Sequence, residues 1–264
     1  MWVYIVRRLA WLPLLLLAVS FITFSLGRFG PGDPVIVILG NRYDPDSLVT
    51  KNLRHELGLD RPFHIQYVDY VWNFVQGDFG ESLRFRAQPV KGLILKKMWV
   101  SAQLAIAAMT VSVGVGLPLG FMIAHLQGKW QDPATVTVAL VLMSVPIMVT
   151  VPALLWLFCL KLHWVPCSGW GGFFDARILV PAITMGVPGI AGFVRLMRAS
   201  TLDVLGQDFI RTAKSKGLKP HVVDTRHVFR NAMIPIITIL SFSMAGLVSG
   251  SFIVETILGV PGIG

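Results

Sequence analysis

The chain has 264 residues, of which 54% are hydrophobic and 14% are charged, and its mean hydropathy is +0.67. A soluble domain carries about 25% charged residues, so this composition indicates an α-helical membrane protein with several spans. The net charge of +9 suggests nucleic-acid binding as an alternative. We reject that alternative because the basic residues stand in loops between apolar segments.

Five apolar segments approach the roughly 20 residues that a helix needs to cross a bilayer. Arg7 and Arg8 precede the first of them, which we interpret as an uncleaved span because it is too long for the core of a signal peptide. The predicted spans are residues 9–26, 99–125, 134–160, 178–196 and 233–253.

The distribution of basic residues predicts the orientation of the spans. Short cytoplasmic loops are enriched in Lys and Arg. The N-terminus, the loop 127–133 with Lys129, and the long loop 198–232 are rich in these residues, whereas loop 161–177 carries them at its two boundaries. We therefore expect a cytoplasmic N-terminus and a cytoplasmic loop 198–232.

The connection 28–98 must then be external, and a connection of this length is translocated whatever its charge. Asp46 and Ser47, together with Val49, Leu53 and Leu57, predict a capped amphipathic helix that ends at Gly58. An aromatic-rich stretch then begins at Pro62 and is ended by residues 77–80. We expect its aromatic side chains to lie on the membrane surface or on the spans.

These boundaries divide the chain into three parts. Residues 1–27 form the cytoplasmic end and the first span, residues 28–98 form an external helical cap, and residues 99–264 form a membrane core with the cytoplasmic loop 198–232.

Prolines and small residues inside the spans leave two questions open. The prolines at 118, 146, 152, 181 and 188 either make ordinary kinks or shape a cavity that opens and closes. Small residues recur every four positions and serve either close packing within the chain or contact with a second, similar subunit. They are Ala108, Ser112, Gly116 and Gly120 in the second span, and Ser241, Ala245 and Ser249 in the fifth.

The sequence contains none of the common catalytic or nucleotide-binding motifs. It has no P-loop, H-E-x-x-H, C-x-x-C or G-x-S-x-G pattern. The middle of each predicted span is free of charged residues, which argues against an ion-coupled carrier and against a membrane-embedded enzyme. Cys159 is interpreted as a packing residue, and a disulfide with Cys167 is not expected. We therefore predict no catalytic residue, no metal site and no cofactor.

The long cytoplasmic loop is the most informative segment. The fourth span should continue as a helix to Gly206, and Asp208 should cap a short helix that ends at Gly217. A second helix should start at Pro220 and run to about Asn231. Two short helices held between two spans make a stiff, basic protrusion, which favours docking of a cytoplasmic partner. An amphipathic hairpin that binds anionic lipid is the alternative.

The motifs of this loop resemble those of one transporter family. The string DFIRTAKSKGL at residues 208–218, followed by RNAMIP at 230–235, resembles the signature loop of ABC-importer permeases of the dipeptide, oligopeptide and nickel branch. Ala213 and Gly217 match the generic E-A-A-x-x-x-G form of that loop, and Arg211 and Thr212 depart from it. Further similar segments are Arg7-Arg8, Pro31-Gly32-Asp33-Pro34 and residues 57–67, 77–83, 195–209 and 255–264.

The resemblance implies an all-α type I ABC importer permease fold in the plasma membrane, with a sixth span expected beyond Gly264. It implies import of peptides or similar solutes; nickel chelates, glutathione and sugars remain alternatives, as does a carrier or channel that is not driven by ATP. The implied partners are a homologous second permease subunit, two cytoplasmic ABC ATPase subunits that hydrolyse ATP, an external substrate-binding protein and membrane lipid. The implied ATPase-coupling residues are Arg211, Thr212, Ala213, Lys214, Ser215, Lys216, Gly217, Leu218 and Lys219.

Overall fold

The computed structural model describes residues 2–30, 33–82, 88–248 and 251–264 of the chain. The described part is helical, and its sole β-type pairing is an isolated bridge between Glu81 and Pro89. The all-α prediction is therefore confirmed. The chain divides into two compact units, Met1–Ile94 and Leu95–Gly264.

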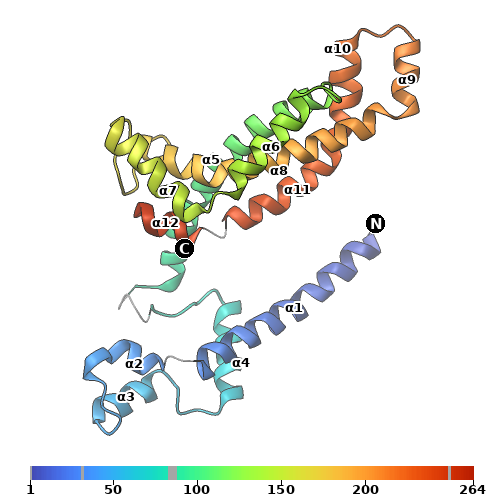
Figure 1. Cartoon of the computed structure of the whole chain (residues 1–264). Coiled ribbons are helices and arrows are strands. Elements are labelled where there is room, and N and C mark those ends of the chain that lie inside the picture. The colour runs from blue at the N-terminus through green and yellow to red at the C-terminus, as the bar shows by residue number, and fades with distance from the viewer. Residues whose placement is uncertain (1, 31–32, 83–87, 249–250) are drawn as a thin grey trace. The chain divides into compact units, whose positions relative to one another are not determined.

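The first unit holds α1 (Trp2–Phe29), α2 (Pro34–Leu39), α3 (Leu48–Glu56) and α4 (Phe63–Val75), with a short 3-10 helix, η1 (Gly40–Arg42). The long helix α5 (Val90–Ala124) begins in the first unit and continues into the second. The remaining elements are α6 (Gln131–Ser144), α7 (Ile147–Leu155), η2 (Trp156–Lys161), η3 (Ala176–Ile178), α8 (Leu179–Leu205), α9 (Asp208–Ser215), α10 (Pro220–Val222), η4 (Val223–Phe229), α11 (Arg230–Val248) and α12 (Phe252–Leu258) (Figure 1).

Four described helical stretches are long and apolar enough to cross a membrane: Ile5–Phe29, Val90–Ala124, Ala176–Leu205 and Pro220–Gly246. The pair Gln131–Ser144 and Ile147–Lys161 makes a fifth span if the two helices are counted as one. All five predicted spans therefore correspond to apolar helical stretches. The second begins earlier than predicted, at Val90, and the third and fifth differ in shape or extent.

The third predicted span, residues 134–160, is not one continuous helix. The two helices of this span meet at an angle of 91°, so the expectation of a simple span was wrong. Pro146 has no N–H to donate, and its ring disfavours the helical conformation of Val145, which is extended with φ −73° and ψ 121°. This proline ends one helix and begins another instead of making an ordinary kink.

The fifth predicted span, residues 233–253, begins and ends earlier than expected. The helix that starts at Pro220 continues through α10, η4 and α11 to Val248. Ser251 then starts a separate helix, α12, by accepting a hydrogen bond from the Val254 N–H. Residues 249 and 250, which include one member of the predicted small-residue row, lie outside the described residues.

The N-terminal unit confirms the helix predicted before Gly58. Ser47 caps α3 by accepting a hydrogen bond from the Thr50 N–H, and Gly58 has a positive φ of 63°. The predicted motif position Asp33 caps α2 in the same way, through the Val35 N–H. The neighbouring positions Pro31 and Gly32, and Leu83 at the end of another predicted motif, lie outside the described residues.

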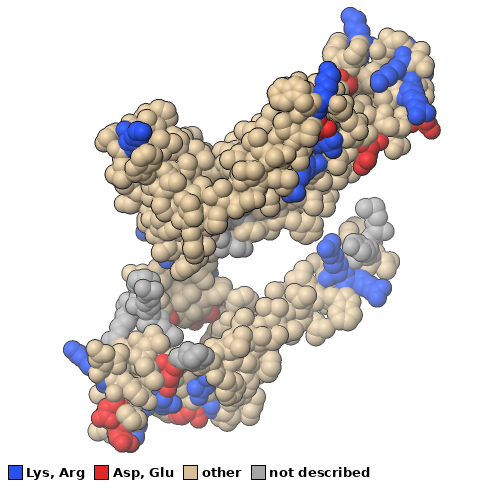
Figure 2. All heavy atoms as spheres, in the orientation of Figure 1, with Lys and Arg blue, Asp and Glu red and all other residues tan. Residues whose placement is uncertain are grey.

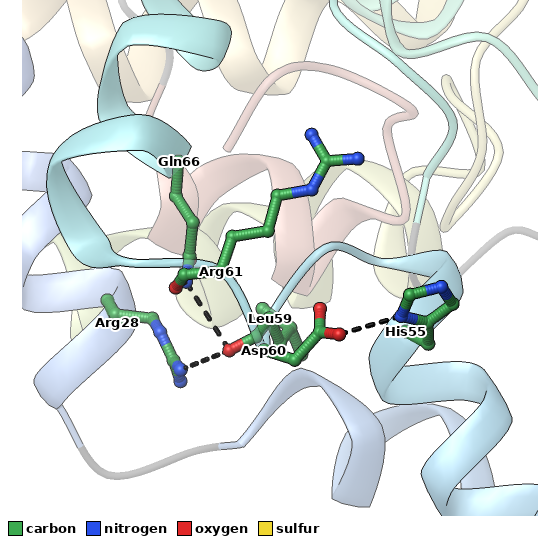
Figure 3. Close-up of polar contacts among 6 residues, drawn as sticks. All are labelled: Arg28, His55, Leu59, Asp60, Arg61 and Gln66. Carbon is green, nitrogen blue, oxygen red and sulfur yellow. Dashed lines mark hydrogen bonds and ion pairs between the residues drawn. The ribbon is translucent and has the colours of Figure 1, made fainter.

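Polar contacts tie the α3–α4 connection to the end of α1. The Leu59 carbonyl accepts hydrogen bonds from the Arg28 guanidinium at 2.9 Å and from the Gln66 amide at 3.3 Å (Figure 3). In the same connection, the hydrogen bond with His55, at 2.7 Å, lowers the pKa of Asp60. These contacts hold α4 against the last turns of α1.

In the second unit, α5 and α8 cross at very small residues. A Cβ atom at Gly120 would lie 2.6 Å from the Val194 carbonyl oxygen, and one at Gly186 would lie 2.9 Å from the Ala108 carbonyl oxygen. The Ser112 hydroxyl donates to the Gly186 carbonyl at 2.7 Å. The small-residue row of the second span thus serves close packing within the chain.

A disulfide joins Cys159 in η2 to Cys167 in the following loop, so our expectation of unpaired cysteines was wrong. Sequence spacing did not reveal the pairing because the loop folds back on the helix that precedes it. The Trp164 N–H donates to the Phe158 carbonyl at 2.9 Å, which returns the chain toward η2. The loop is in turn attached to α12, because the Gly169 N–H donates to the Leu258 carbonyl at 2.8 Å.

Replacing Gly120 with alanine should destabilise the second unit, because the added Cβ meets the backbone of α8. We expect a cost of about 1–3 kcal/mol, the usual range for overpacking. Gly114→Ala is the matched control, since it lies on the same helix and a Cβ there meets nothing within 4 Å. Thermal unfolding of the purified variants in detergent measures the difference. Equal unfolding temperatures for the two variants would contradict the close α5–α8 contact.

Candidate functional site

The candidate site is the protrusion formed by α9, the turn 216–219 and α10 with η4, beyond the C-terminal end of α8 (Figure 1). As predicted, α8 runs past the fourth span and stops before Gly206. Asp208 does not cap α9; Gln207 occupies the cap position without a side-chain hydrogen bond. Asp208 instead lies in the first turn of α9, where the helix dipole stabilises its negative charge. Its carboxylate lies 3.6 Å from the Arg211 guanidinium.

The turn after α9 depends on the backbone of Gly217. The helix ends here as predicted: the φ of Gly217 is +73°, and its N–H donates to the Lys214 carbonyl at 3.0 Å. A Cβ atom at this position would meet nothing within 4 Å, so space inside the chain does not require glycine here. Pro220 begins the next helix, and the Val222 and Val223 N–H groups both donate to the Lys219 carbonyl.

The second loop helix is not separate from the fifth span. We predicted that it would end near Asn231, but the helix continues without a break into α11. The seven-residue π-helical turn η4 carries the chain through this point, and the Asn231 amide donates to the His227 carbonyl at 2.6 Å. The protrusion is therefore one short helix, α9, closed against the extended end of a long one.

A small apolar core holds α9 in place. Ile210 and Ala213 are buried against Val223 and Val228 of η4. Phe121 of α5 packs beside this core, together with Val204 and Leu205 at the end of α8. Ala213 is therefore a packing residue of the protrusion and not part of its outer surface.

The other eight predicted coupling residues are exposed, and the structure brings them together on one surface. Figure 2 shows that the Lys and Arg side chains gather over α9 and α10. Phe209 and Leu218 add apolar area to this surface, with exposures of 44% and 40%. We call it the docking surface: Phe209, Arg211, Thr212, Lys214, Ser215, Lys216, Gly217, Leu218 and Lys219. It suits an acidic or mixed polar–apolar protein surface, or anionic lipid.

The base of the protrusion is braced by polar and aromatic contacts. His125, just after α5, lies 3.3 Å from the Asp224 carboxylate of η4, and the Phe121 ring packs edge-on against Phe229. A second pair lies nearby: the partly exposed Arg198 guanidinium donates two hydrogen bonds to the buried Asp132 carboxylate, at 2.5 and 2.6 Å. This pair joins the start of α6 to α8, so the end of the helix bundle is held as a unit.

Sequence reasoning missed two buried carboxylates. Asp132 stood at a predicted loop boundary and Glu255 inside a short motif, and neither pattern indicated burial. Glu255 is 2% exposed and accepts hydrogen bonds from the Ser101 hydroxyl at 2.8 Å and the Gly264 N–H at 2.7 Å. An acidic residue within an apolar stretch was the available signal. In the described residues, no three His, Cys, Asp or Glu side chains are grouped for a metal ion.

Comparison with known proteins gives consistent matches along the chain. A family model of binding-protein-dependent transport system inner membrane components matches residues 116–264, and a model of the N-terminal part of such components matches residues 1–110. A putative peptide transport system permease of Brucella abortus (strain 2308) is 33% identical over 266 residues, which cover 98% of this chain and 84% of the relative.

Two further relatives are similar over the same extent. A di/tripeptide transport system permease of Pseudomonas aeruginosa is 36% identical over 287 residues, covering 99% of this chain and 85% of the relative. A glutathione transport system permease of Escherichia coli O1:K1 is 34% identical over 261 residues, covering 99% of this chain and 84% of the relative.

Arg198→Ala should destabilise the protein, because it leaves the buried Asp132 carboxylate without its partner. Breaking a fully buried pair costs about 3–5 kcal/mol, and we expect a smaller cost of about 1–3 kcal/mol here because the Arg198 side chain is 28% exposed. Arg195→Ala is the control, since Arg195 lies one turn earlier on α8 and is exposed. Thermal unfolding in detergent compares the two variants. Equal unfolding temperatures for the two variants would mean that the Arg198–Asp132 pair does not stabilise the protein.

Proposed function

The chain belongs to the family of binding-protein-dependent transport system inner membrane components, and we propose that it is one permease subunit of an ATP-driven importer for peptides or similar small solutes. It is a multi-pass protein of the inner membrane and a transport permease. The use of ATP as the energy source, the transported substrate and the partner subunits are our proposal. The observation that carries the proposal is the docking surface, a basic and partly apolar surface on a braced helix outside the membrane core.

We propose that the docking surface receives cytoplasmic ABC ATPase subunits, which bind and hydrolyse ATP. Its nine residues include eight of the predicted coupling residues, and Ala213 anchors them from below. The sequence carries no P-loop, which supports a division of labour in which the energy source is a separate subunit.

Rigidity makes the protrusion suitable for transmitting movement. α9 is joined to the end of α8 by the short Gly206-Gln207 link and packs on η4, which is continuous with α11. A displacement of α9 by a partner would therefore move two membrane helices together. In the proposed mechanism, ATPase movement delivered in this way switches the translocation cavity between outward- and inward-facing states.

The bend at Pro146 is a second feature suited to a translocation pathway. A cavity of about 240 Å³ lies at this bend, lined by residues of α6, α7 and α8 that include Ser144, Thr150 and Thr184. Irregular backbone at membrane depth is tolerated where it is buried in protein or lines a water-filled cavity. The bend therefore supports a pathway role for α6 and α7 more than a simple anchoring role.

The cargo and the remaining partners follow from the family and its relatives. The names of the relatives refer to peptide, di/tripeptide and glutathione transport, which favours peptides, including glutathione, over nickel chelates and sugars. The family description refers to a binding protein, which supports an external substrate-binding partner. We further propose a homologous second permease subunit and two ATPase subunits.

The proposed orientation places the N-terminus and the docking surface in the cytoplasm, and the external cap at residues 28–98. Two observations support it. Basic side chains gather beyond the C-terminal end of α8, and the Cys159–Cys167 disulfide lies in the loop before its N-terminal end. Disulfides persist in oxidising compartments outside the cytoplasm, so the two ends of α8 should face opposite sides of the membrane.

A carrier that uses an ion gradient is the alternative function. Such carriers use ionisable groups inside the membrane. The Asp132–Arg198 pair lies at the end of the bundle next to the protrusion, and Glu255 lies in the short helix α12. Neither stands in the middle of a span-length helix, so the described residues favour a permease driven by partner subunits.

Cysteine labelling tests the orientation. Asp46→Cys should react with a membrane-impermeant thiol reagent in intact cells, whereas Lys214→Cys should react only after the cells are opened. Both positions are exposed, and the native cysteines are held in the disulfide. Labelling of Lys214→Cys from outside would show that the orientation is reversed.

Gly217→Val tests the docking surface. The positive φ disfavours valine by about 1 kcal/mol or more, and its side chain projects from the surface that a partner would cover. We expect normal membrane insertion, weaker co-purification of the ATPase subunits and loss of ATP-dependent peptide uptake.

The matched control is Gly80→Val in the proposed external cap. Gly80 has a φ of +68°, and a Cβ atom there, as at Gly217, would meet nothing within 4 Å. This substitution imposes the same backbone strain on the other side of the membrane and should leave ATPase co-purification unchanged. If Gly217→Val behaves like Gly80→Val in both assays, the lipid-binding alternative replaces the docking proposal.

A further inference from the structure

The helix α4 crosses the end of α1 through aromatic side chains. The Phe24 ring contacts three α4 rings, those of Phe63, Tyr67 and Tyr70, at centroid distances of 5.3–5.6 Å. Because one residue of α1 meets two successive turns of α4, α4 lies across α1 instead of running along it (Figure 1). The Tyr67 hydroxyl completes the contact by donating to the Leu17 carbonyl at 2.9 Å.

These contacts place α4 at a defined level of the membrane. The α1 groups that contact α4 run from the Leu17 carbonyl to the Phe29 ring, so they lie within about 18 Å of the end of the helix at about 1.5 Å per residue. Half of a bilayer's hydrocarbon core is about 15 Å thick. Since α1 is long and apolar enough to cross the membrane, α4 lies mostly beside the half of it that one leaflet surrounds.

A second face of α4 is apolar and exposed. Ile65, Val68, Trp72 and Val75 are separated by three, four and three positions and therefore share one side of the helix. Their exposures rise from 41% at Ile65 to 62%, 64% and 72% at the other three. We call these four residues the α4 stripe. Such a stripe would be costly in water.

The third face of α4 is polar. Asp69, Asn73 and Gln76 are exposed and follow one another at spacings of four and three positions. Asp69 pairs with Arg61 at 3.2 Å in the connection before the helix. A helix with one apolar face, one polar face and a tryptophan on the apolar side has the pattern of helices that lie in the plane of a membrane interface.

We propose that α4 is an interfacial membrane helix, with the α4 stripe among the acyl chains of the leaflet around the C-terminal end of α1 and its polar face toward the headgroups. Lipid is the occupant because α4 packs through its aromatic rings on α1, a helix that is itself long and apolar enough to cross the membrane. The Arg28–Leu59 hydrogen bond and the ring contacts fix the helix at this depth. The aromatic segment would thus be a membrane anchor and not part of a water-exposed cap.

Spin-label accessibility tests this proposal without a transport assay, and its result does not depend on which way the chain is oriented. Single cysteines replace Val68, Trp72, Val75 or, as the matched polar-face control, Asn73; the native cysteines are held in the disulfide. The labelled chain is reconstituted with its co-expressed partner subunits in phosphatidylethanolamine–phosphatidylglycerol vesicles. Collision with lipid-soluble oxygen and with a water-soluble nickel chelate is then measured at each site.

We expect the oxygen-to-nickel ratio at the three stripe positions to exceed that at Asn73 severalfold. Equally low ratios at all four positions would mean that the stripe faces water, and equally high ratios would mean that the polar face is also in lipid; either result would overturn the proposal. Low collision with both reagents at Val68 and Val75 would mean that protein, such as a second permease subunit, covers the stripe, and would overturn it equally.

Discussion

The close crossing of α5 and α8 is the contact on which the second unit depends. Inside a bilayer, apolar side chains gain little from leaving lipid for one another, so helices associate through close packing and polar contacts. Glycines on both helices let their backbones meet, and the Ser112 hydroxyl bonds to the carbonyl of Gly186 across the crossing. These contacts fix α8 to α5. The position of α8 in turn determines where the structures at its two ends lie.

Each end of α8 carries a different kind of structure. Before its N-terminal end lie the disulfide loop and the contact with α12. In α12, the Glu255 carboxylate accepts hydrogen bonds from the Ser101 hydroxyl and the Gly264 N–H. After its C-terminal end lie the Arg198–Asp132 pair and the protrusion, whose core is shared with α5 and η4. In addition, the Ser200 hydroxyl donates to the Ala232 carbonyl of α11 at 2.8 Å. A helix held this firmly near the protrusion suits the proposed transmission of a partner's movement into the membrane.

Helix boundaries that depend on local backbone chemistry could be predicted from the sequence. Features that depend on tertiary contacts could not. Gly217 and Pro220 mark real helix boundaries because their effects on φ or on hydrogen bonding act within a few residues. Gly206 also follows the end of α8, but with an ordinary φ of −76°. The outcome at Pro146 depends on whether neighbouring helices straighten or separate the two halves, so sequence could not choose between a kink and a 91° bend. The Cys159–Cys167 pairing likewise depends on a loop that folds back on η2, which residue spacing does not encode. The predicted coupling residues lie together on the protrusion, but burial of Ala213 became visible only in three dimensions, and their role in coupling stays a prediction.

A photo-crosslinking amino acid at Leu218 tests the central claim most directly, since this side chain lies 40% exposed in the middle of the docking surface. The full set of subunits is co-expressed in cells, irradiated, and separated by size. Docking of an ATPase predicts one discrete crosslinked species that contains this chain and an ATPase subunit, and loss of that species when the ATPase is left out. Crosslinking to lipid alone, with the ATPase present, would contradict the account and assign the protrusion to the membrane surface.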